Sequence, residues 1–237
     1  MKLDVKLLPQ DNSRWELTGS VCIVLDIFRA TTSIITALSN GCAAVLPVLS
    51  ADDANSVAKQ LDAPLFAGER QSIKIEGFHF GNSPFEFSAA RVQKQTIIMT
   101  TTNGTIAIKA TENAYLTLLG SFINANAVCR AARKQGRDIV IVCAGTDGLF
   151  SLEDALCAGL LVNLLNHDTR YVLTDSAQGV QAMYGGAESV SAIASKSRNG
   201  KRLYDMGLQK DVEYCLRTDV VTTVPQYRKG MITSLVL

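Results

Sequence analysis

The sequence has almost no net charge and no apolar run long enough to cross a membrane. Its 23 basic and 22 acidic residues leave a formal charge of +1, so no overall field attracts nucleic acid or an anionic membrane. Charged residues interrupt each apolar run, and residues 1–6 lack the apolar core of a signal peptide. We therefore expect a soluble cytoplasmic protein with no nucleic-acid or membrane partner, in which any recognition of an anion is local.

Histidine is scarce and Cys-x-x-Cys pairs are absent, which narrows the possible metal chemistry. The six cysteines lie mostly inside apolar segments, a pattern that favours buried free thiols over disulfides or zinc. The two histidines, His79 and His167, are too few for a histidine-rich transition-metal site. If a metal is bound, we expect carboxylate ligands and a hard ion such as Mg²⁺.

Apolar content and the order of segments favour an α/β fold. With 237 residues and 47% hydrophobic content, the chain can bury a full core. We expect one α/β domain over 1–237, with two tightly packed α/β halves as the alternative. Three short apolar strands, at 21–25, 96–99 and 138–143, each end in polar residues and lead toward a helix. Parallel strands would place these polar ends along one edge, where α/β proteins bind ligands.

Other patterns predict the remaining elements. Further strands are expected over 3–8, 43–48, 64–67, 115–119, 171–174 and 220–224, the last stopped by Pro225. Helices are expected over 31–38, 50–61, 87–93, 121–136, 151–166 and 210–216, with two short helices between 176 and 197. We expect a turn at 9–13, an anchored aromatic loop at 71–86 that serves as a lid or site wall, and a basic loop at 199–208.

Asp26 and Arg29 are the strongest candidates for chemistry. They could simply form an ion pair in the first turn of a helix, since they lie three residues apart. At the end of a buried strand, however, a carboxylate commonly faces the ligand crevice. Arg29 would then offer two parallel donors to phosphate or carboxylate oxygens. We favour this functional interpretation of the pair.

The polar run 100–105 has two interpretations. It could be a turn followed by a capped helix. Alternatively, Asn103 and Gly104 could adopt positive φ, so that consecutive N–H groups hold an anion between the neighbouring hydroxyls. The run lacks the lysine of a P-loop, which argues against nucleotide binding.

Several other polar residues have a structural explanation as well as a functional one. Glu69 and Arg70 could be solvated loop charges. The remaining candidates could be turn or cap residues favoured by helix dipoles, with Asp154 completing a capping box that begins at Ser151. These are Ser121, Asn124, Asp147, Glu153 and Asp154.

The sequence lacks the motifs of three familiar types of hydrolase active site. A cysteine enzyme needs Cys and Arg to bracket a phosphate loop, but Cys22 lies inside a strand and six residues separate it from Arg29. An aspartyl nucleophile with a partner acid two residues later is missing, because Phe28 takes that place. No Gly-x-Ser-x-Gly elbow occurs. Metal-assisted chemistry with carboxylates remains.

Six separated motifs, in order along residues 21–159, resemble those of the 2-phosphosulfolactate phosphatase family. They are Asp26-Ile27-Phe28-Arg29-Ala30-Thr31-Thr32, Gly68-Glu69-Arg70, Gly81-Asn82-Ser83-Pro84, Thr100-Thr101-Thr102-Asn103-Gly104-Thr105, Gly120-Ser121-Phe122-Ile123-Asn124-Ala125 and Phe150-Ser151-Leu152-Glu153-Asp154. Each motif is weak alone, but the six together are specific. The match to the last third of the chain is weaker.

The resemblance implies a three-layer α/β/α fold with a mainly parallel or mixed central sheet. It also implies Mg²⁺-dependent hydrolysis of the small anionic substrate 2-phospho-3-sulfolactate to sulfolactate and phosphate, in a route to coenzyme M. Asp26 and Arg29 would be catalytic, and Asp26 would ligate the metal with Glu69 or Asp154. The implied substrate-binding residues are Arg70, Asn82, Ser83, Thr101, Thr102, Asn103, Gly104, Thr105, Ser121 and Asn124.

Several alternatives stay open at this point. Asp26 could ligate a metal that activates water, or could attack phosphorus itself. The substrate could be another phosphorylated hydroxy acid. The protein could instead be a non-catalytic carrier of a small organic phosphate or sulfonate, or a structural subunit whose polar turns only cap helices. The apolar segment 231–237 could pack in the interface of a homo-oligomer.

Overall fold

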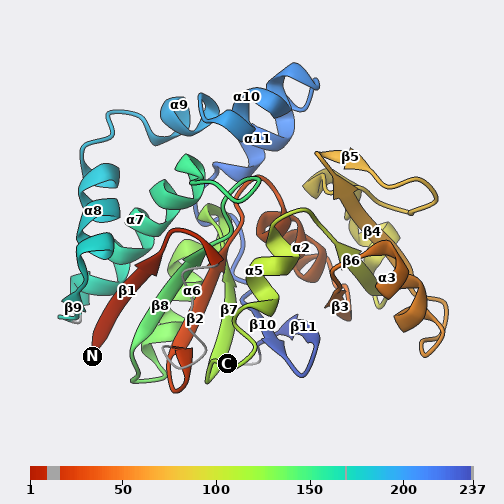
Figure 1. Cartoon of the computed structure of the whole chain (residues 1–237), viewed down its shortest axis with the longest axis horizontal. Helices are drawn as coiled ribbons and strands as arrows, with labels where there is room; N and C mark the ends of the chain where they lie inside the picture. The colour runs from red at the N-terminus through yellow and green to blue at the C-terminus, as the bar shows by residue number, and fades with distance from the viewer. Residues whose placement is uncertain (10–16, 169, 236–237) are drawn as a thin grey trace.

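The computed structural model describes residues 1–9, 17–168 and 170–235, and within them the strands form one eleven-stranded sheet (Figure 1). In hydrogen-bonded order the strands are β5 (Ile73–Lys74), β4 (Leu65–Arg70), β6 (Thr96–Thr100), β3 (Ala44–Pro47), β11 (Met231–Ser234), β10 (Pro225–Arg228), β7 (Leu116–Gly120), β2 (Val21–Leu25), β8 (Ile139–Cys143), β1 (Lys2–Lys6) and β9 (Val172–Leu173). The first strand is therefore shorter than predicted, and most of the predicted turn at 9–13 lies outside the described residues.

The sheet consists of two parallel groups joined by an antiparallel hairpin. β4, β6 and β3 are parallel to one another, and so are β7, β2, β8, β1 and β9. Between the groups, β11 pairs antiparallel with β3, and β10 pairs antiparallel with both β11 and β7. The prediction of an α/β fold with a mixed central sheet is confirmed.

The helices cover both faces of the sheet (Figure 1). They are α2 (Ala30–Ser39), α3 (Ala51–Ala58), α4 (Ala89–Val92), α5 (Gly104–Lys109), α6 (Ala125–Arg133), α7 (Leu152–Asp168), α8 (Asp175–Gly185), α9 (Val190–Ser195), α10 (Arg198–Asp205) and α11 (Gln209–Cys215), with short 3-10 turns η2 (Pro84–Glu86) and η3 (Phe122–Asn124). Along β2, Ile23 and Leu25 face a core shared with α6 and α7, whereas Cys22 and Val24 face one shared with α2 and α5. This alternation produces three layers.

The core between α2, α5 and the sheet contains residues of both strand groups. Val24 from β2, Val45 from β3 and Met99 from β6 belong to this one cluster. Ile98 of β6 faces the opposite side and packs with Ala54 of α3. All six cysteines are buried and free, as predicted. No helix in the described parts of the chain is both long and apolar enough to cross a bilayer.

Two predictions for the last quarter of the chain are wrong. The expected basic loop at 199–208 begins as helix α10, whose N-terminus is capped by the Ser197 hydroxyl accepting the Gly200 N–H at 3.0 Å. The strand expected at 220–224 lies instead at Pro225–Arg228. Proline is compatible with the first position of a strand, so Pro225 begins the strand and does not end it.

The segment expected to reach a subunit interface lies partly inside the sheet. After β10, Lys229 and Gly230 take φ values of 51° and 81°. Positive φ at both central residues suits a tight hairpin turn. The turn returns the chain as β11, whose Ile232 is fully buried between β10 and β3. Residues 231–234 thus pack within their own chain, and residues 236–237 lie outside the described residues.

Candidate active site

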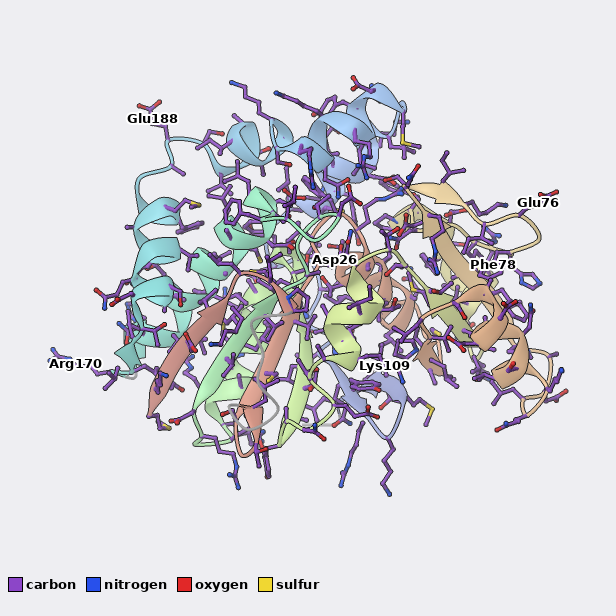
Figure 2. All side chains as sticks on the ribbon, in the orientation of Figure 1. Asp26, Glu76, Phe78, Lys109, Arg170 and Glu188 are labelled. Atoms are coloured by element: carbon purple, nitrogen blue, oxygen red, sulfur yellow. The ribbon has the colours of Figure 1, made fainter. Side chains whose placement is uncertain are left out.

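Asp26 ends β2 and fixes the turn into α2. The Asp26 N–H donates to the Thr31 hydroxyl at 3.0 Å, and the Asp26 carbonyl accepts the Thr31 N–H at 3.1 Å. The Ala30 N–H donates to Oδ1 of Asp26 at 3.1 Å, which leaves Oδ2 directed toward Gly104. Figure 2 shows Asp26 near the middle of the molecule, where the ends of the central strands face α10 and α11. The Asp26 side chain is therefore buried and lies at the carboxyl end of the central strand β2.

The turn after β6 lies directly against Asp26. A Cβ atom at Gly104 would lie 2.7 Å from Oδ2 of Asp26 and 2.5 Å from Cβ of Ala30. Neither Asn103 nor Gly104 adopts positive φ, so the predicted anion nest with that geometry is wrong. The glycine is required by close approach and not by its backbone angle. The hydroxyls of Thr101 and Thr105 bond to the backbone within this turn, so they hold its shape.

Glu69, near the end of β4, connects the turn after β6 with the loop after β4. Oε1 of Glu69 accepts the Thr102 N–H at 2.8 Å. Oε2 accepts the Ser72 N–H at 2.7 Å and the Thr102 hydroxyl at 3.2 Å. Glu69 thus joins two turns of one strand group, and the contact of Gly104 with Asp26 brings that group against the other, although three antiparallel pairings separate them along the sheet.

A small cavity of about 20 Å³ lies where these segments meet. Its lining is Asp26, Phe28, Arg29, Glu69, Ser72, Asn82, Thr102, Asn103, Asn199 and Arg202. Asn82 is only 5% exposed, and its Oδ1 atom has no hydrogen-bond partner among the described residues. A buried amide oxygen without a donor costs free energy, so Oδ1 of Asn82 is available to a bound ligand or water.

Arg29 is held by an ion pair inside the site. Its Nη1 lies 2.6 Å from Oδ2 of Asp211, at the start of α11, and its Nη2 donates to the Ser72 carbonyl at 3.3 Å. Oδ1 of Asp211 accepts the Ser83 hydroxyl at 2.8 Å. Both ends of the guanidinium are therefore oriented by the protein before any anion binds.

Helix α10 closes one side of the cavity. Nδ2 of Asn199 donates to the Phe28 carbonyl at 2.6 Å. One turn later, Nη2 of Arg202 lies 2.8 Å from Oδ2 of Asp147, whose N–H donates to Oδ1 of Asn103 at 3.1 Å. A segment predicted to be a loop thus supplies two lining residues.

Burial dominates the electrostatics of the acidic residues. It raises the pKa of Asp26 to about 7, with nearby Glu69 and Glu153 adding to the shift and the Ala30 N–H and Arg29 opposing it. Burial also raises the pKa of Asp154 well above its ordinary value, and Glu153 and Asp26 raise it further. The pKa of Glu153 is raised by burial as well, against hydrogen bonds from Ser197 and other neighbours. Perturbed carboxyl groups of this kind cluster at functional sites.

Six of the predicted site residues line the cavity together. They are Asp26, Arg29, Glu69, Asn82, Thr102 and Asn103. Thr101, Gly104 and Thr105 shape the turn beside them. The structure therefore brings most of the separated segments into one place.

Five other predicted residues point elsewhere. Arg70 donates to the Glu69 and Leu49 carbonyls and to Thr100, and Ser83 bonds to Asp211. Ser121 and Asn124 form a capping box, and Asn124 donates to the Leu119 and Thr223 carbonyls. The Asp154 oxygens accept the Ile27 N–H at 2.9 Å and the Gly145 N–H at 3.1 Å, so this side chain joins two loops and does not reach back to Ser151.

Four lining residues were not predicted from the sequence. They are Phe28, Ser72, Asn199 and Arg202. Phe28 and Ser72 lie next to predicted residues, so adjacency was an available signal. For Asn199 and Arg202 the signal was the Ser197 cap followed by polar residues three apart, which lie on one face of a helix.

The residues present fit a magnesium ion only in part. Within residues 1–9, 17–168 and 170–235, no three His, Cys, Asp or Glu side chains are grouped so as to hold a metal ion. Mg²⁺ is commonly bound by one or two carboxylates, with waters and substrate phosphates completing its shell. Asp26, Glu69 and the unpartnered Oδ1 of Asn82 supply oxygen atoms of that kind around one cavity. Asp154 does not line it.

The fold and the site define an α/β protein with an acidic cavity, flanked by guanidinium groups, at the carboxyl ends of its strands. The chain belongs to the 2-phosphosulpholactate phosphatase family, whose sequence profile matches residues 7–230. A protein of Clostridium acetobutylicum named probable 2-phosphosulfolactate phosphatase is 41% identical over 235 residues, 98% of this chain and 100% of that protein. Proteins of the same name from Clostridium kluyveri and Clostridium novyi are 38% and 35% identical, each over 98% of this chain and over 97% and 100% of their own lengths. The family predicted from the six motifs is confirmed.

Proposed function

We propose that the protein is a magnesium-dependent phosphatase that hydrolyses 2-phospho-3-sulfolactate to sulfolactate and phosphate. The observation that carries this proposal is the cavity in which Asp26, Glu69, Arg29 and the unpartnered Asn82 amide converge from both strand groups. Membership of the family supports the choice of substrate. Six buried free thiols suit a reducing compartment, so we propose a cytoplasmic setting.

The charges around the cavity favour a cation beside the substrate. Arg29 is paired with Asp211 and Arg202 with Asp147. Among the described residues, neither Asp26 nor Glu69 forms an ion pair within 4.0 Å. An ester that carries phosphate, sulfonate and carboxylate groups would meet two carboxylates without a counter-ion of their own. A divalent cation offsets this repulsion.

Asp26, Glu69 and the Oδ1 atom of Asn82 would hold the ion. When bound, Mg²⁺ polarises the phosphoryl oxygens and lowers the pKa of a bound water. The protein then has little covalent chemistry to perform beyond positioning groups and stabilising charge. This is the role that the oriented side chains of the cavity fit.

Each remaining lining group has a separate task in this proposal. Arg29, held in place by Asp211, presents positive charge to the transferred phosphoryl group. Neither the Asn103 nor the Gly104 N–H has an acceptor among the described residues, so both are available to a phosphoryl oxygen. Glu69 fixes the Thr102 and Ser72 backbone, which positions the turns after β6 and β4 beside the cavity.

Asp26 has one carboxylate oxygen free for chemistry. Its Oδ1 accepts the Ala30 N–H, while Oδ2 faces the Gly104 turn. A pKa of about 7 allows the group to hold or release a proton near neutral pH. Attack on phosphorus by Oδ2 would form an aspartyl phosphate, whereas attack by water would not. Trapping with beryllium fluoride separates the two, because only the covalent mechanism is expected to give an adduct on Asp26.

Phosphate release from 2-phospho-3-sulfolactate tests the proposal. We expect saturable release with Mg²⁺, loss of release with a chelator, and a loss of about 1,000-fold or more in kcat for Asp26→Asn. Binding of the ester without phosphate release would identify a carrier and overturn the proposal. Faster release from another phosphorylated hydroxy acid would keep the phosphatase and change its substrate. Unchanged activity in Arg29→Ala and Asp26→Asn would show that the polar turns are only structural.

A further inference from the structure

Two guanidinium groups line the cavity, and they are held in different ways. The Arg29 side chain is 4% exposed and bonds to both Asp211 and the Ser72 carbonyl. The Arg202 side chain is 32% exposed, and its bond to Asp147 is the only one it makes with a described residue. Arg202 therefore keeps most of its five N–H donors free at the open side of the cavity.

Helix α10 is fixed at its start, so the position of Arg202 is set by the fold. Ser197 caps the helix, and Asn199 donates to the Phe28 carbonyl in the turn that follows β2. The buried carboxyl group of Glu153 accepts hydrogen bonds from Ser197 and Asn199. Arg202 lies three residues after Asn199 and thus on the same face of the helix. The contacts that fix Asn199 therefore also direct Arg202 toward the cavity.

The inner cavity is too small for the whole ester. Its volume of about 20 Å³ accommodates roughly one group of the size of a water molecule. Outside it, a shallow hollow of about 590 Å³ is lined by Arg198, Lys201, Arg202, Asp205 and Met206. Arg202 belongs to both linings. Arg202 is thus the residue at which a substrate with its phosphate beside Asp26 would reach this basic hollow.

We propose that Arg202 of α10 determines substrate specificity by binding a second anionic group of the ester, a sulfonate or a carboxylate, while the phosphate lies at Asp26 and Arg29. This inference rests on the proposed phosphatase function. A guanidinium can donate two parallel hydrogen bonds to either anion. Asp147 holds the guanidinium in place without using all of its donors. Specificity then comes from a helix that none of the six motifs contains.

Kinetics with three esters test the role of Arg202. They are 2-phospho-3-sulfolactate, 2-phospholactate, which lacks the sulfonate, and the phosphate ester of isethionate, which lacks the carboxylate. For Arg202→Gln we expect a loss of about 100-fold in kcat/KM toward the ester that carries the recognised group. Toward the ester that lacks this group, the loss should be at most about three-fold. The loss should appear mainly in KM, and Arg202→Lys should recover part of it because the charge remains.

The matched control is Lys210→Gln, which removes an exposed positive charge from the neighbouring helix α11 and lies in neither lining. We expect its kinetics to stay within about two-fold of wild type. Equal losses toward all three esters in Arg202→Gln would overturn the inference, because the residue would then serve folding or the phosphoryl group. Equal effects of Arg202→Gln and Lys210→Gln would also overturn it.

A binding measurement separates this inference from the phosphatase proposal. Calorimetry with 3-sulfolactate, and with lactate and isethionate as singly charged comparisons, needs no turnover. We expect Arg202→Gln to weaken 3-sulfolactate binding about ten-fold or more, whereas Lys210→Gln should bind it as wild type does. If no ester is hydrolysed but this pattern appears, the phosphatase proposal fails and the assignment of Arg202 holds. Binding that is equal in wild type and Arg202→Gln overturns the assignment.

Discussion

At the scale of single residues, burial changes the pKa of Asp26, and close packing against Asp26 restricts position 104 to glycine. The carboxylate is needed at the end of β2 and is nevertheless removed from water, so its pKa rises to about 7. Gly104 has no side chain because Oδ2 of Asp26 and Cβ of Ala30 occupy that space. In both cases the residue type is set by a neighbour distant in sequence.

Replacing Asp26 by Asn should stabilise the metal-free protein while it removes activity. The folded-state pKa of Asp26 lies above the unfolded value of 3.8. The protonated Asp26 carboxyl group therefore stabilises the folded protein fully below pH 3.8, and this contribution is lost as the pH rises through about 7. Asn carries no charge, so the free energy of unfolding of Asp26→Asn at pH 8 should exceed that of wild type by a few kcal/mol, and by less at pH 5. Urea denaturation in a chelator measures both values.

The control for that prediction is Asp62→Asn, which changes an exposed carboxylate. Its free energy of unfolding should stay within about 0.5 kcal/mol of wild type at both pH values. An Asp26→Asn variant that is less stable than wild type at pH 8, or whose gain does not depend on pH, would contradict the raised pKa.

Gly104→Ala should cost both stability and activity, although alanine favours helices. A Cβ atom there would lie 2.5 Å from Cβ of Ala30 and 2.7 Å from Oδ2 of Asp26, so the turn or Asp26 must shift. We expect a loss of about 1–3 kcal/mol in unfolding free energy and at least about ten-fold in kcat. The matched variant is Gly179→Ala, exposed in α8 with nothing within 4 Å, which should gain about 0.5–1 kcal/mol. If both variants gained stability, the close approach of Gly104 to Asp26 would be refuted.

The residues that could be predicted from the sequence were those whose position at a strand end settles their direction. Asp26 is of this kind, whereas Glu69 was implied by the family motif. Arg70 was expected beside Glu69, but successive side chains in a strand point to opposite faces, so both cannot face one cavity. Ser83 follows Asn82 and likewise bonds elsewhere. The pleat of β4 separates Arg70 from Glu69, whereas Ser83 lies in the loop before η2, and the family motifs do not distinguish residues that line the cavity from those beside it.

At the scale of elements, helix α10 determines the open side of the cavity. Its sequence contains Asn199 and Gly200, which have poor helix propensity, and the segment was predicted as a basic loop. Tertiary contacts override that preference, since Leu203 is fully buried and Ser197 caps the helix. The hairpin β10–β11 was missed in a similar way, because Pro225 was interpreted as the end of a strand.

Ser197→Ala tests whether the anchoring of α10 affects substrate binding. Loss of the cap should lower the free energy of unfolding by about 1 kcal/mol. Because the same hydroxyl bonds to Glu153, KM for the ester should also rise several-fold. Ser189→Ala removes the equivalent cap from α9, where the hydroxyl accepts the Ala192 N–H at 3.2 Å. That variant should lose similar stability with unchanged KM, as measured by denaturation and steady-state kinetics. A KM that responds equally to both changes would contradict a specific role for α10.

At the scale of the whole molecule, two groups of parallel strands share one site across an antiparallel hairpin. The sequence predicts β2 and β6 with their polar ends, and it correctly predicts that these ends meet. It does not reveal that β10 and β11 lie between the groups, because strand order depends on pairings between distant segments. Within one group, Glu69 accepts a hydrogen bond from Thr102. The same turn places Gly104 against Asp26 of the other group, and this contact joins the two groups at the site.

The central claim is that both strand groups contribute oxygen atoms to one cation site, and a Mn²⁺ titration followed by electron paramagnetic resonance tests it most directly. We predict one bound ion per chain, with affinity at least about ten-fold weaker in both Asp26→Asn and Glu69→Gln and unchanged in Asp62→Asn. Circular dichroism confirms that each variant is folded. Wild-type affinity in either Asp26→Asn or Glu69→Gln would contradict a site shared between the two groups.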